Sequence, residues 1–186
     1  MARIAVLSDT HSYHDLRETV PEWVRAEVEA ADYAVHAGDF VTPSALEFFR
    51  DLATDLVAVR GNADVGVDLP EVATLTVEGV SLVVTHPPDI DDASLDRAAY
   101  DRAVLAAVES VGEMPSASDD RPVLAVAGHT HRVIDEVVEG VRLLNPGSAT
   151  GALPAERPTL LRLRVSEGEV DVTVLDPESE GGDHGG

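Results

Sequence analysis

The stretch Gly128-His129-Thr130-His131 contains two histidines separated by one residue, directly after a short apolar run. Two imidazoles placed this closely rarely bind one metal ion in a relaxed geometry. At a sharp turn after a strand, however, they can flank a pocket from two directions. That arrangement suits two neighbouring metal ions with one imidazole each. A surface turn with a hydrogen-bonded histidine is the alternative interpretation of the same four residues.

Other residues of metal-binding type also follow short apolar runs. They are Asp9 and His11 in Asp9-Thr10-His11, Asp39 after Gly38, Asn62 after Gly61, and His86. In open α/β sheets, ligands bind beyond the carboxyl ends of the strands, so polar residues that all follow strands converge on one pocket. The glycines beside Asp39, Asn62 and His129 fit tight turns in which two backbones approach closely. The five stretches together predict a metal-binding pocket, although each alone is a weak signal.

The elements that must position these residues begin as alternating strands and helices. Apolar patterns predict strands at 4–7, 33–36 and 56–59, and helices at 15–31 and 42–52. Pro21 marks a break or a first turn in the first helix. Thr42-Pro43 gives the second helix an N-cap with proline at the first helical position. This βαβαβ order predicts parallel strands joined by right-handed crossovers.

The second half of the chain is richer in hairpins. Paired strands are predicted at 74–77 and 81–85, at 133–138 and 141–144, and at 160–165 and 170–175, each pair flanking a Glu-Gly dipeptide. A strand is also predicted at 123–127, a helix at 94–110, a polar loop at 115–122 and a turn at Asn145-Pro146-Gly147-Ser148. We therefore predict an α/β fold: a four-layer α/β/β/α sandwich, with two packed, mainly mixed sheets flanked by helices. Residues 1–176 would form one domain, and residues 177–186 an acidic, glycine-rich disordered tail.

The composition is that of a globular protein, with 186 residues of which 44% are hydrophobic. No apolar run approaches the ~20 residues of a membrane helix, and the N-terminal run is too short for a signal peptide. We therefore predict a cytoplasmic protein with no membrane partner. The chain has no cysteine, so a metal ion must bind to oxygen and imidazole ligands.

The charge is unusual, because the chain has 35 acidic residues and only 13 basic ones, all of them arginine, which gives a net charge of −22. Acidic chains without lysine are typical of salt-loving organisms, where high ionic strength screens self-repulsion. An ordinary acidic protein with an acidic tail is the alternative, but the acids are spread along the whole chain. The same charge argues against non-specific binding to nucleic acid.

Taken together, the motifs resemble those of the calcineurin-like metallophosphoesterase superfamily over roughly residues 3–175. The short chain and the Asn145-Pro146-Gly147-Ser148 turn are similar to its small bacterial and archaeal phosphodiesterase branch. The resemblance implies seven metal ligands: Asp9, His11, Asp39, Asn62, His86, His129 and His131. Asp9, His11 and His131 would hold one divalent ion, and Asn62, His86 and His129 the other. Asp39 would bridge both ions.

The resemblance also implies a dinuclear-metal-dependent phosphoesterase that acts on a small phosphoester, as a phosphodiesterase rather than a phosphomonoesterase. A hydroxide bridging two ions ~3.5–4 Å apart would attack phosphorus in line. The hydroxide and the phosphate would be held through Asp39, Asn62, His86 and His129. The ligand set suits Mn²⁺, the ion we expect, and also Ni²⁺, Fe²⁺ or Zn²⁺. The alternative is a catalytically weak metal-binding scaffold of the retromer-subunit type; a homo-oligomer is compatible with either.

Two departures from the family pattern concern the rim of the pocket. Ala63 and Asp64 follow Asn62, where many members have a histidine that stabilises the phosphate or protonates the leaving group. Pro87-Pro88 follows His86, where glycine is common.

Residues beside the motifs have two interpretations each. His14 is either the general acid or a surface histidine. Asp64 either orients a ligand or caps a turn, and His36 either packs in the core or supports a ligand. Arg60 and Arg132 either bind phosphate or form ion pairs.

Overall fold

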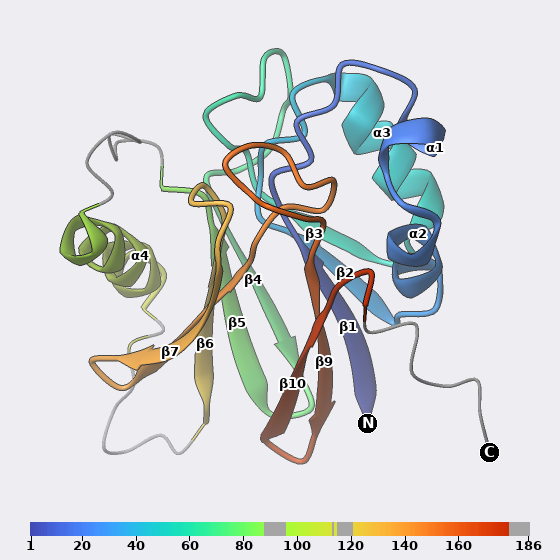
Figure 1. Cartoon of the computed structure of the whole chain (residues 1–186). Coiled ribbons are helices and arrows are strands. Elements are labelled where there is room, and N and C mark those ends of the chain that lie inside the picture. Colours follow the sequence, from blue (N-terminus) through green and yellow to red (C-terminus); the bar gives the residue numbers. More distant parts are fainter. Residues whose placement is uncertain (88–95, 113, 115–120, 179–186) are drawn as a thin grey trace.

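Two five-stranded sheets pack face to face, with helices on both outer sides, in the computed structural model of the chain (Figure 1). The structure describes residues 1–87, 96–112, 114 and 121–178. The two packed sheets and their outer helices confirm the predicted four-layer α/β/β/α sandwich. Residues 94–95 of the helix predicted at 94–110, residues 115–120 of the predicted loop and residues 179–186 of the predicted tail lie outside the described residues.

The first sheet has the strand order β10-β9-β1-β2-β3. Its strands are β1 (Ala2–Leu7), β2 (Tyr33–His36), β3 (Leu56–Ala58), β9 (Leu160–Ser166) and β10 (Glu169–Leu175). Strands β1, β2 and β3 are parallel, as the βαβαβ pattern predicts, and β9 and β10 extend the sheet as an antiparallel hairpin. The helices on its outer face are α1 (Leu16–Thr19), α2 (Glu22–Glu29) and α3 (Pro43–Leu52).

The second sheet has the strand order β4-β5-β6-β8-β7. Its strands are β4 (Val72–Val77), β5 (Val80–Thr85), β6 (Val123–Ala127), β7 (Val133–Val138) and β8 (Val141–Pro146). The parallel strands β5, β6 and β8 form its centre, and β4 and β7 are antiparallel edges. Helix α4 (Arg97–Ser110) covers its outer face.

Local sequence signals account for the helix boundaries. The predicted first helix is interrupted at Pro21, which separates α1 from α2. The side chain of Thr42 accepts a hydrogen bond from the backbone of Ala45 at the start of α3, and Asp96 caps α4 in the same way. One prediction was wrong: residues 145 and 146 are the end of β8 and not a turn. Their backbone continues the pairing with β7.

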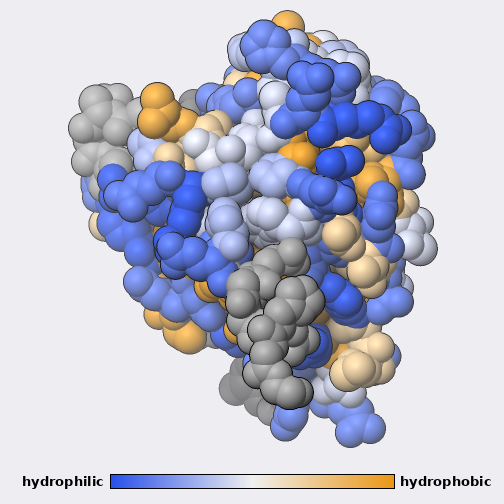
Figure 2. Space-filling view, turned by 45° about the vertical axis from the view of Figure 1, so that its right-hand side comes forward, coloured by the Kyte–Doolittle hydropathy of each residue, from blue (hydrophilic) through white to orange (hydrophobic). Residues whose placement is uncertain are grey.

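Three apolar layers separate the four structural layers. Ile4, Val6 and Leu161 belong to the layer between the two sheets. A second layer lies between the first sheet and its helices, and Tyr100 belongs to the third, beneath α4. Hydrophilic residues predominate on the face shown in Figure 2, as the acidic composition leads one to expect.

The two ends of the sheets differ in their connections. In Figure 1 the β4–β5 and β9–β10 hairpin turns lie at the lower end and the β7–β8 turn projects to the left, whereas loops from the carboxyl ends of the parallel strands gather at the upper end. No helix among the described residues is long and apolar enough to cross a membrane.

Candidate metal centre

The seven predicted metal ligands all lie at the upper end of the sandwich. They follow the strands in this order: Asp9 and His11 after β1, Asp39 after β2, Asn62 after β3, His86 after β5, and His129 and His131 after β6. Because these strands are parallel neighbours within the two sheets, their carboxyl ends meet at one edge. The structure therefore brings together residues that lie up to 122 positions apart in the chain, from 9 to 131.

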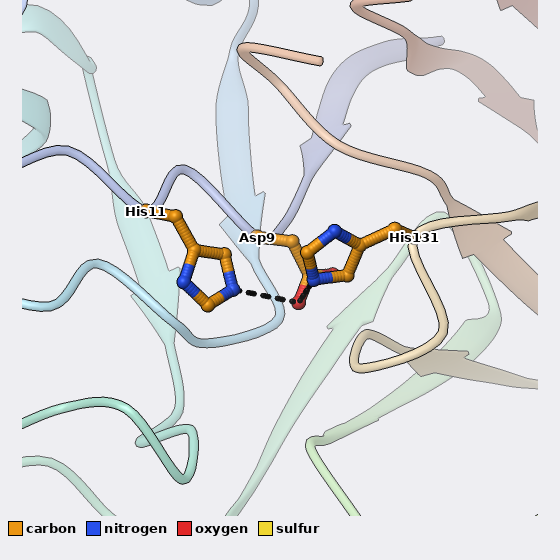
Figure 3. A group of neighbouring side chains, drawn as sticks. All are labelled: Asp9, His11 and His131. Carbon is orange, nitrogen blue, oxygen red and sulfur yellow. Dashed lines mark ion pairs between the residues drawn. The ribbon is translucent and has the colours of Figure 1, made fainter. Parts of the chain in front are cut away.

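The first group of ligands is centred on Asp9, whose carboxylate is fully buried. The Nε2 atoms of His11 and His131 lie 3.8 and 3.2 Å from its Oδ1 atom. Figure 3 shows both imidazoles pointing at this carboxylate. One atom from each of these three residues lies within 4.8 Å of the others, which is close enough for a single ion to contact all three.

The second group lies around His86, which is also buried. Its Nε2 atom is 3.4 Å from Oδ2 of Asp39 and 3.0 Å from Oδ1 of Asn62. Nδ1 of His129 lies 2.9 Å from the same Asn62 oxygen. The two histidines of the Gly128–His131 stretch thus reach different groups, as the opening sequence argument predicts. Asn62 itself is exposed, so this group opens to solvent.

Asp39 lies between the two groups. Its Oδ2 atom is 3.1 Å from Nε2 of His11 and 3.4 Å from Nε2 of His86. One carboxylate oxygen therefore faces an imidazole of each group, as a bridging ligand must. The geometry also departs from the expected division, because Asp9 lies within 4.8 Å of ligand atoms in both groups, including Asp39 and His86. The assignment of each ligand to one ion stays a prediction.

The two carboxylates carry strongly perturbed electrostatics. Burial by itself would raise the pKa of Asp9 and of Asp39, but the neighbouring histidines outweigh burial and hold both pKa values well below the usual range. Burial would lower the pKa of His11, yet Asp39 and Asp9 raise it to about 9. Asp39 and Asp9 also raise the pKa of His86 against burial, and Asp9 raises that of His131. Protonated imidazoles here supply the positive charge that bound cations would supply.

The ring orientations fit metal binding. Nδ1 of His86 donates to the Ala37 carbonyl at 2.6 Å, and Nδ1 of His131 donates to the Ala152 carbonyl at 2.8 Å. These contacts leave both Nε2 atoms unprotonated and facing the pocket when the rings are neutral, as in many metal sites. The buried Nε2 atom of His11 has no hydrogen-bond partner among the described residues. Its contact with Asp39 is therefore electrostatic only, and a cation between the two would satisfy it.

The backbone of the ligand loops is strained. Five ligands have positive φ angles: Asp9 (51°), His11 (41°), Asp39 (61°), His129 (80°) and His131 (56°). For residues with a side chain this conformation costs roughly 1–2 kcal/mol each. Such strain persists where surrounding contacts impose it, and it is concentrated at functional sites.

Two glycines permit the close approach of these loops. A Cβ atom at Gly128 would lie 2.1 Å from Oγ of Ser8 and 2.8 Å from Nδ1 of His86. A Cβ atom at Gly61 would lie 2.1 Å from Oδ1 of Asp39. These contacts confirm the close backbone approach expected from the sequence, and any larger residue would displace a predicted ligand.

The other histidines singled out in the sequence lie differently. His14 is exposed, so its role as a general acid stays a prediction. His36 is fully buried, stacks on Phe40 with 3.6 Å between ring centroids, and its Nε2 atom lies 2.9 Å from Oγ1 of Thr10. Burial lowers the pKa of His36 to about 3, which keeps the ring neutral. It is a packing residue that also supports the Asp9–His11 loop.

Asp64 caps turns, and among the described residues it forms no hydrogen bond with His86. Its carboxylate accepts hydrogen bonds from the backbone N–H groups of Asp39 (3.1 Å), Val41 (2.7 Å) and Gly61 (2.7 Å). It thereby joins the loop that carries Asp39 to the loop that carries Asn62.

The two arginines beside the motifs differ from each other. Arg60 forms an exposed ion pair with Glu71 at 2.7 Å. The guanidinium of Arg132 is exposed and has no ion pair with another described residue. Arg60 therefore forms an ion pair, as one of the two interpretations expects, and phosphate binding by either arginine stays a prediction.

Three supporting residues were not among the predicted site residues. The Ser8 hydroxyl donates to Oδ2 of Asp9 at 2.6 Å. Asn145 and Ser148 make buried hydrogen bonds to the ligand loops. Their signal in the sequence was the Asn145-Pro146-Gly147-Ser148 motif, which we had interpreted only as a turn.

A pocket of about 320 Å³ lies beside the second group. Asn62 and His86 line it on one side, and Val72, Pro87 and Ala103 give it an apolar wall. The pocket is therefore large enough for a small organic group next to the candidate metal ligands.

Comparisons with known proteins agree with this geometry. A profile described as "Calcineurin-like phosphoesterase superfamily domain" matches residues 2–168. A probable metallophosphoesterase of Methanocaldococcus jannaschii is 30% identical over 147 residues, covering 79% of this chain and 68% of that protein. A phosphodiesterase of the same organism is 24% identical over 166 residues, covering 81% and 86%. The zinc complex of Vps29 from Entamoeba histolytica shares the fold with a TM-score of 0.66 at 20% identity, covering 94% and 98%. The chain belongs to the calcineurin-like phosphoesterase superfamily.

Proposed function

We propose that the protein is a dinuclear-metal-dependent phosphodiesterase that acts on a small phosphoester. The observation that carries the proposal is the position of one Asp39 oxygen between an imidazole of each ligand group, 3.1 Å from His11 and 3.4 Å from His86. In this assignment Asp9, His11 and His131 hold one ion. Asn62, His86 and His129 hold the other, and Asp39 bridges them.

The donor set fits divalent metals of intermediate hardness. Carboxylate, amide oxygen and imidazole suit Mn²⁺, our first choice, and also Fe²⁺, Ni²⁺ and Zn²⁺. Two such ions held close together lower the pKa of bound water and stabilise the charge that develops on a phosphoryl group. The buried Nε2 atom of His11, which lies beside the Asp39 carboxylate but has no hydrogen-bond partner within the described part of the chain, supports a cation at the first group.

The chain's own residues would orient the substrate. The second group opens to solvent at Asn62, and the 320 Å³ pocket adjoins it. One ester group of a substrate would lie against Val72, Pro87 and Ala103, which offer it an apolar surface. Arg60 is paired with Glu71 at this pocket, and the carboxylate of Asp64 also lines it; these acidic groups favour an uncharged ester group over a second phosphate.

Preference for diesters over monoesters rests on two further points. The first is that a relative from Methanocaldococcus jannaschii, 86% of whose length is matched by this chain, is a phosphodiesterase. In this chain Ala63 follows Asn62, so no histidine is present at that position to protonate a leaving group. Aryl esters need little protonation, and we expect them to react faster than alkyl esters. His14 is the candidate general acid that would narrow this difference.

A metal-binding scaffold without turnover, the alternative that the family resemblance offers, is the second candidate, and the chain shares its fold with the zinc complex of Vps29. That likeness concerns the fold alone. All seven ligand positions in this chain hold residues able to bind a metal ion, and this favours the enzyme.

Hydrolysis of bis(p-nitrophenyl) phosphate by the Mn²⁺-loaded protein tests the proposal. We expect turnover, and we expect His129→Ala to lower kcat by more than about 100-fold, because the second ion loses a ligand. His184→Ala, a histidine change outside the seven ligands, is the matched control and should leave kcat unchanged. Metal-loaded protein without turnover of diesters or monoesters would support the scaffold, and turnover that survives His129→Ala would point to a contaminating enzyme.

A further inference from the structure

Residues 145–150, which contribute none of the seven ligands, make hydrogen bonds to both loops that carry the first ligand group. We infer that this segment, which we name the clamp segment, holds the two loops in their strained conformation. Asn145 and Ser148 would be its positioning residues. The inference rests on the proposed dinuclear centre, because positioning has meaning only if the loops bind metal ions.

Asn145 acts on the loop that carries His129 and His131. Its side chain is fully buried at the end of β8. Its Nδ2 atom lies 3.0 Å from the Gly128 carbonyl oxygen and 3.1 Å from Oγ1 of Thr130. These two groups flank His129 on either side. The amide therefore fixes the backbone before and after a ligand whose φ angle is 80°.

The orientation of this amide is determined by its partners. Its Oδ1 atom accepts a hydrogen bond from the Gly147 backbone N–H at 2.9 Å, so the NH₂ group must face the Gly128 carbonyl. The Tyr100 hydroxyl lies 2.9 Å from Nδ2 and also donates to the Gly128 carbonyl at 3.1 Å. A carboxylate at position 145 could still accept the hydrogen bond from the Gly147 N–H. Its second oxygen, however, would face the Gly128 carbonyl oxygen without a proton to donate.

Ser148 acts on the loop that carries Asp9 and His11. It is fully buried, and its Oγ atom donates to the Asp9 carbonyl oxygen at 2.7 Å. The same Oγ accepts from the backbone N–H of Ala152 at 2.9 Å. Because the Ala152 carbonyl accepts from Nδ1 of His131, Ser148 also supports the residue that orients this ring.

Two further contacts make the connection continuous. The Ala149 backbone N–H donates to the Ser8 carbonyl at 2.9 Å, and the Thr150 hydroxyl donates to the Thr10 carbonyl at 2.8 Å. Three successive residues of the clamp segment thus bond to three successive residues at the end of β1. A segment that only connected β8 to β9 would not require this register. The stabilisation by one buried hydrogen bond is comparable to the cost of one residue in the left-handed conformation. Loss of one such bond should therefore let a ligand loop relax.

Amide hydrogen exchange of the metal-free protein tests the clamp directly. Asp9 and His11 donate their backbone N–H groups to the carbonyls of Gly38 and Asp39, so both amides should be protected in the native state. Ser148→Ala should raise their exchange rates by about tenfold, the loss expected for one buried hydrogen bond. Asn145→Asp should have its largest effect at the amide of His129.

Ser110→Ala is the matched control. It makes the same change of residue, and the Ser110 hydroxyl donates to the Ala107 carbonyl at 2.7 Å, the same length as the Ser148 bond, but within α4, which carries no predicted ligand and no part of the clamp segment. It should leave the exchange at the ligand loops unchanged. Tyr100→Phe removes only the hydroxyl from the Asn145 network and replaces Asn145→Asp if that variant does not fold.

Manganese titration is the second measurement. Ser148→Ala should lower the affinity for one of the two Mn²⁺ ions by about tenfold and leave the affinity for the other unchanged. Asn145→Asp should lower both affinities, because the loop that Asn145 holds supplies one histidine to each ion. Exchange that rises equally across the protein, or metal loss in Ser110→Ala equal to that in Ser148→Ala, would overturn the clamp. Wild-type protein that binds fewer than two ions would instead refute the dinuclear centre, and the exchange pattern would still decide on the clamp.

Discussion

Left-handed backbone occurs at both ends of the sandwich, but for different reasons. Away from the ligand loops it occurs in the three hairpin turns, where Glu78, Glu139 and Glu167 have φ angles of 50°, 50° and 52°. At the upper end it occurs at five metal-ligand candidates. The same conformational signal therefore marks two kinds of structure.

The conformation of the hairpin turns follows from their own two central residues. Each glutamate is exposed and is followed by a glycine whose φ angle is also positive, between 80° and 85°. Two central residues with positive φ match the twist of antiparallel strands, and this is the preferred two-residue hairpin. Local sequence therefore accounts for the conformation of these turns, and the hydrogen bond from the Gly168 N–H to the Glu78 carbonyl adds a link between two of them.

The ligand loops need help from distant residues. Asp9, Asp39, His129 and His131 are buried, and their conformation is held by bonds to other loops. The difference teaches that positive φ indicates function only when the residue is buried, polar and held from elsewhere in the fold. The predictions below test this distinction, from the largest expected effect to the smallest.

Asp39→Ala should have the largest effect. This residue faces both ligand groups, so the variant should lose both Mn²⁺ ions and all activity, as measured by elemental analysis and diester hydrolysis. Glu139→Ala, at a hairpin residue with similar φ, is the control and should retain two ions. Loss of a single ion in Asp39→Ala would refute the bridging role.

The second prediction concerns pH. His11 has a pKa of about 9, above its ordinary value of about 6.5. In the metal-free protein its contribution to stability is therefore full below pH ~6.5 and is lost as the pH rises towards 9. A metal ion needs the unprotonated ring, so Mn²⁺ affinity should rise over the same window, by roughly tenfold per pH unit where one proton is displaced.

Calorimetric titration in buffers of different ionisation enthalpy would count the released protons. At the acid end, Asp9 and Asp39 have lowered pKa values, so their contribution is present above their ordinary pKa and is lost as the pH falls. Metal affinity that is flat between pH 6.5 and 9 would contradict the proposed ligand role of His11.

The third prediction concerns salt. The net charge of −22 should make the surface repel itself, while the buried carboxylates at the upper end are compensated by histidines. The melting temperature should therefore rise as KCl approaches molar concentration, where the Debye length is ~3 Å. A melting temperature that is flat or falls over this range would remove the salt-adapted interpretation of the composition.

The smallest effect is expected at the hairpins. Asparagine tolerates left-handed backbone better than glutamate, so Glu139→Asn should stabilise the protein by up to about 1 kcal/mol and raise the melting temperature by roughly 2–4 °C. His131→Asn, with a comparable φ of 56°, should instead weaken metal binding, because its Nε2 atom no longer faces Asp9. Equal behaviour of the two variants in a metal titration would remove the distinction between the two ends.

Most of the fold could be predicted from the sequence because its signals are local. The apolar runs before Ser8 and Gly38 predict buried strands, Pro21 predicts the break between α1 and α2, and the Glu-Gly pairs predict the hairpins. The candidate ligands could be predicted because each directly follows such a strand. Residue 145 was placed wrongly, in a turn, because proline and glycine nearby outweighed a strand pairing that depends on β7.

The sequence by itself determined the ligand types, their order after the strands, the absence of thiolate ligands and the family. Only the tertiary structure decided which oxygen of Asp39 faces two histidines, that Asp9 lies near both groups, and that Ser148 bonds to the Asp9 carbonyl 139 residues away. The physical reason is the range of the interactions involved. Strand and turn preferences act between neighbours in the chain, whereas a metal pocket and its supporting hydrogen bonds require atoms from different strands to meet within about 3 Å.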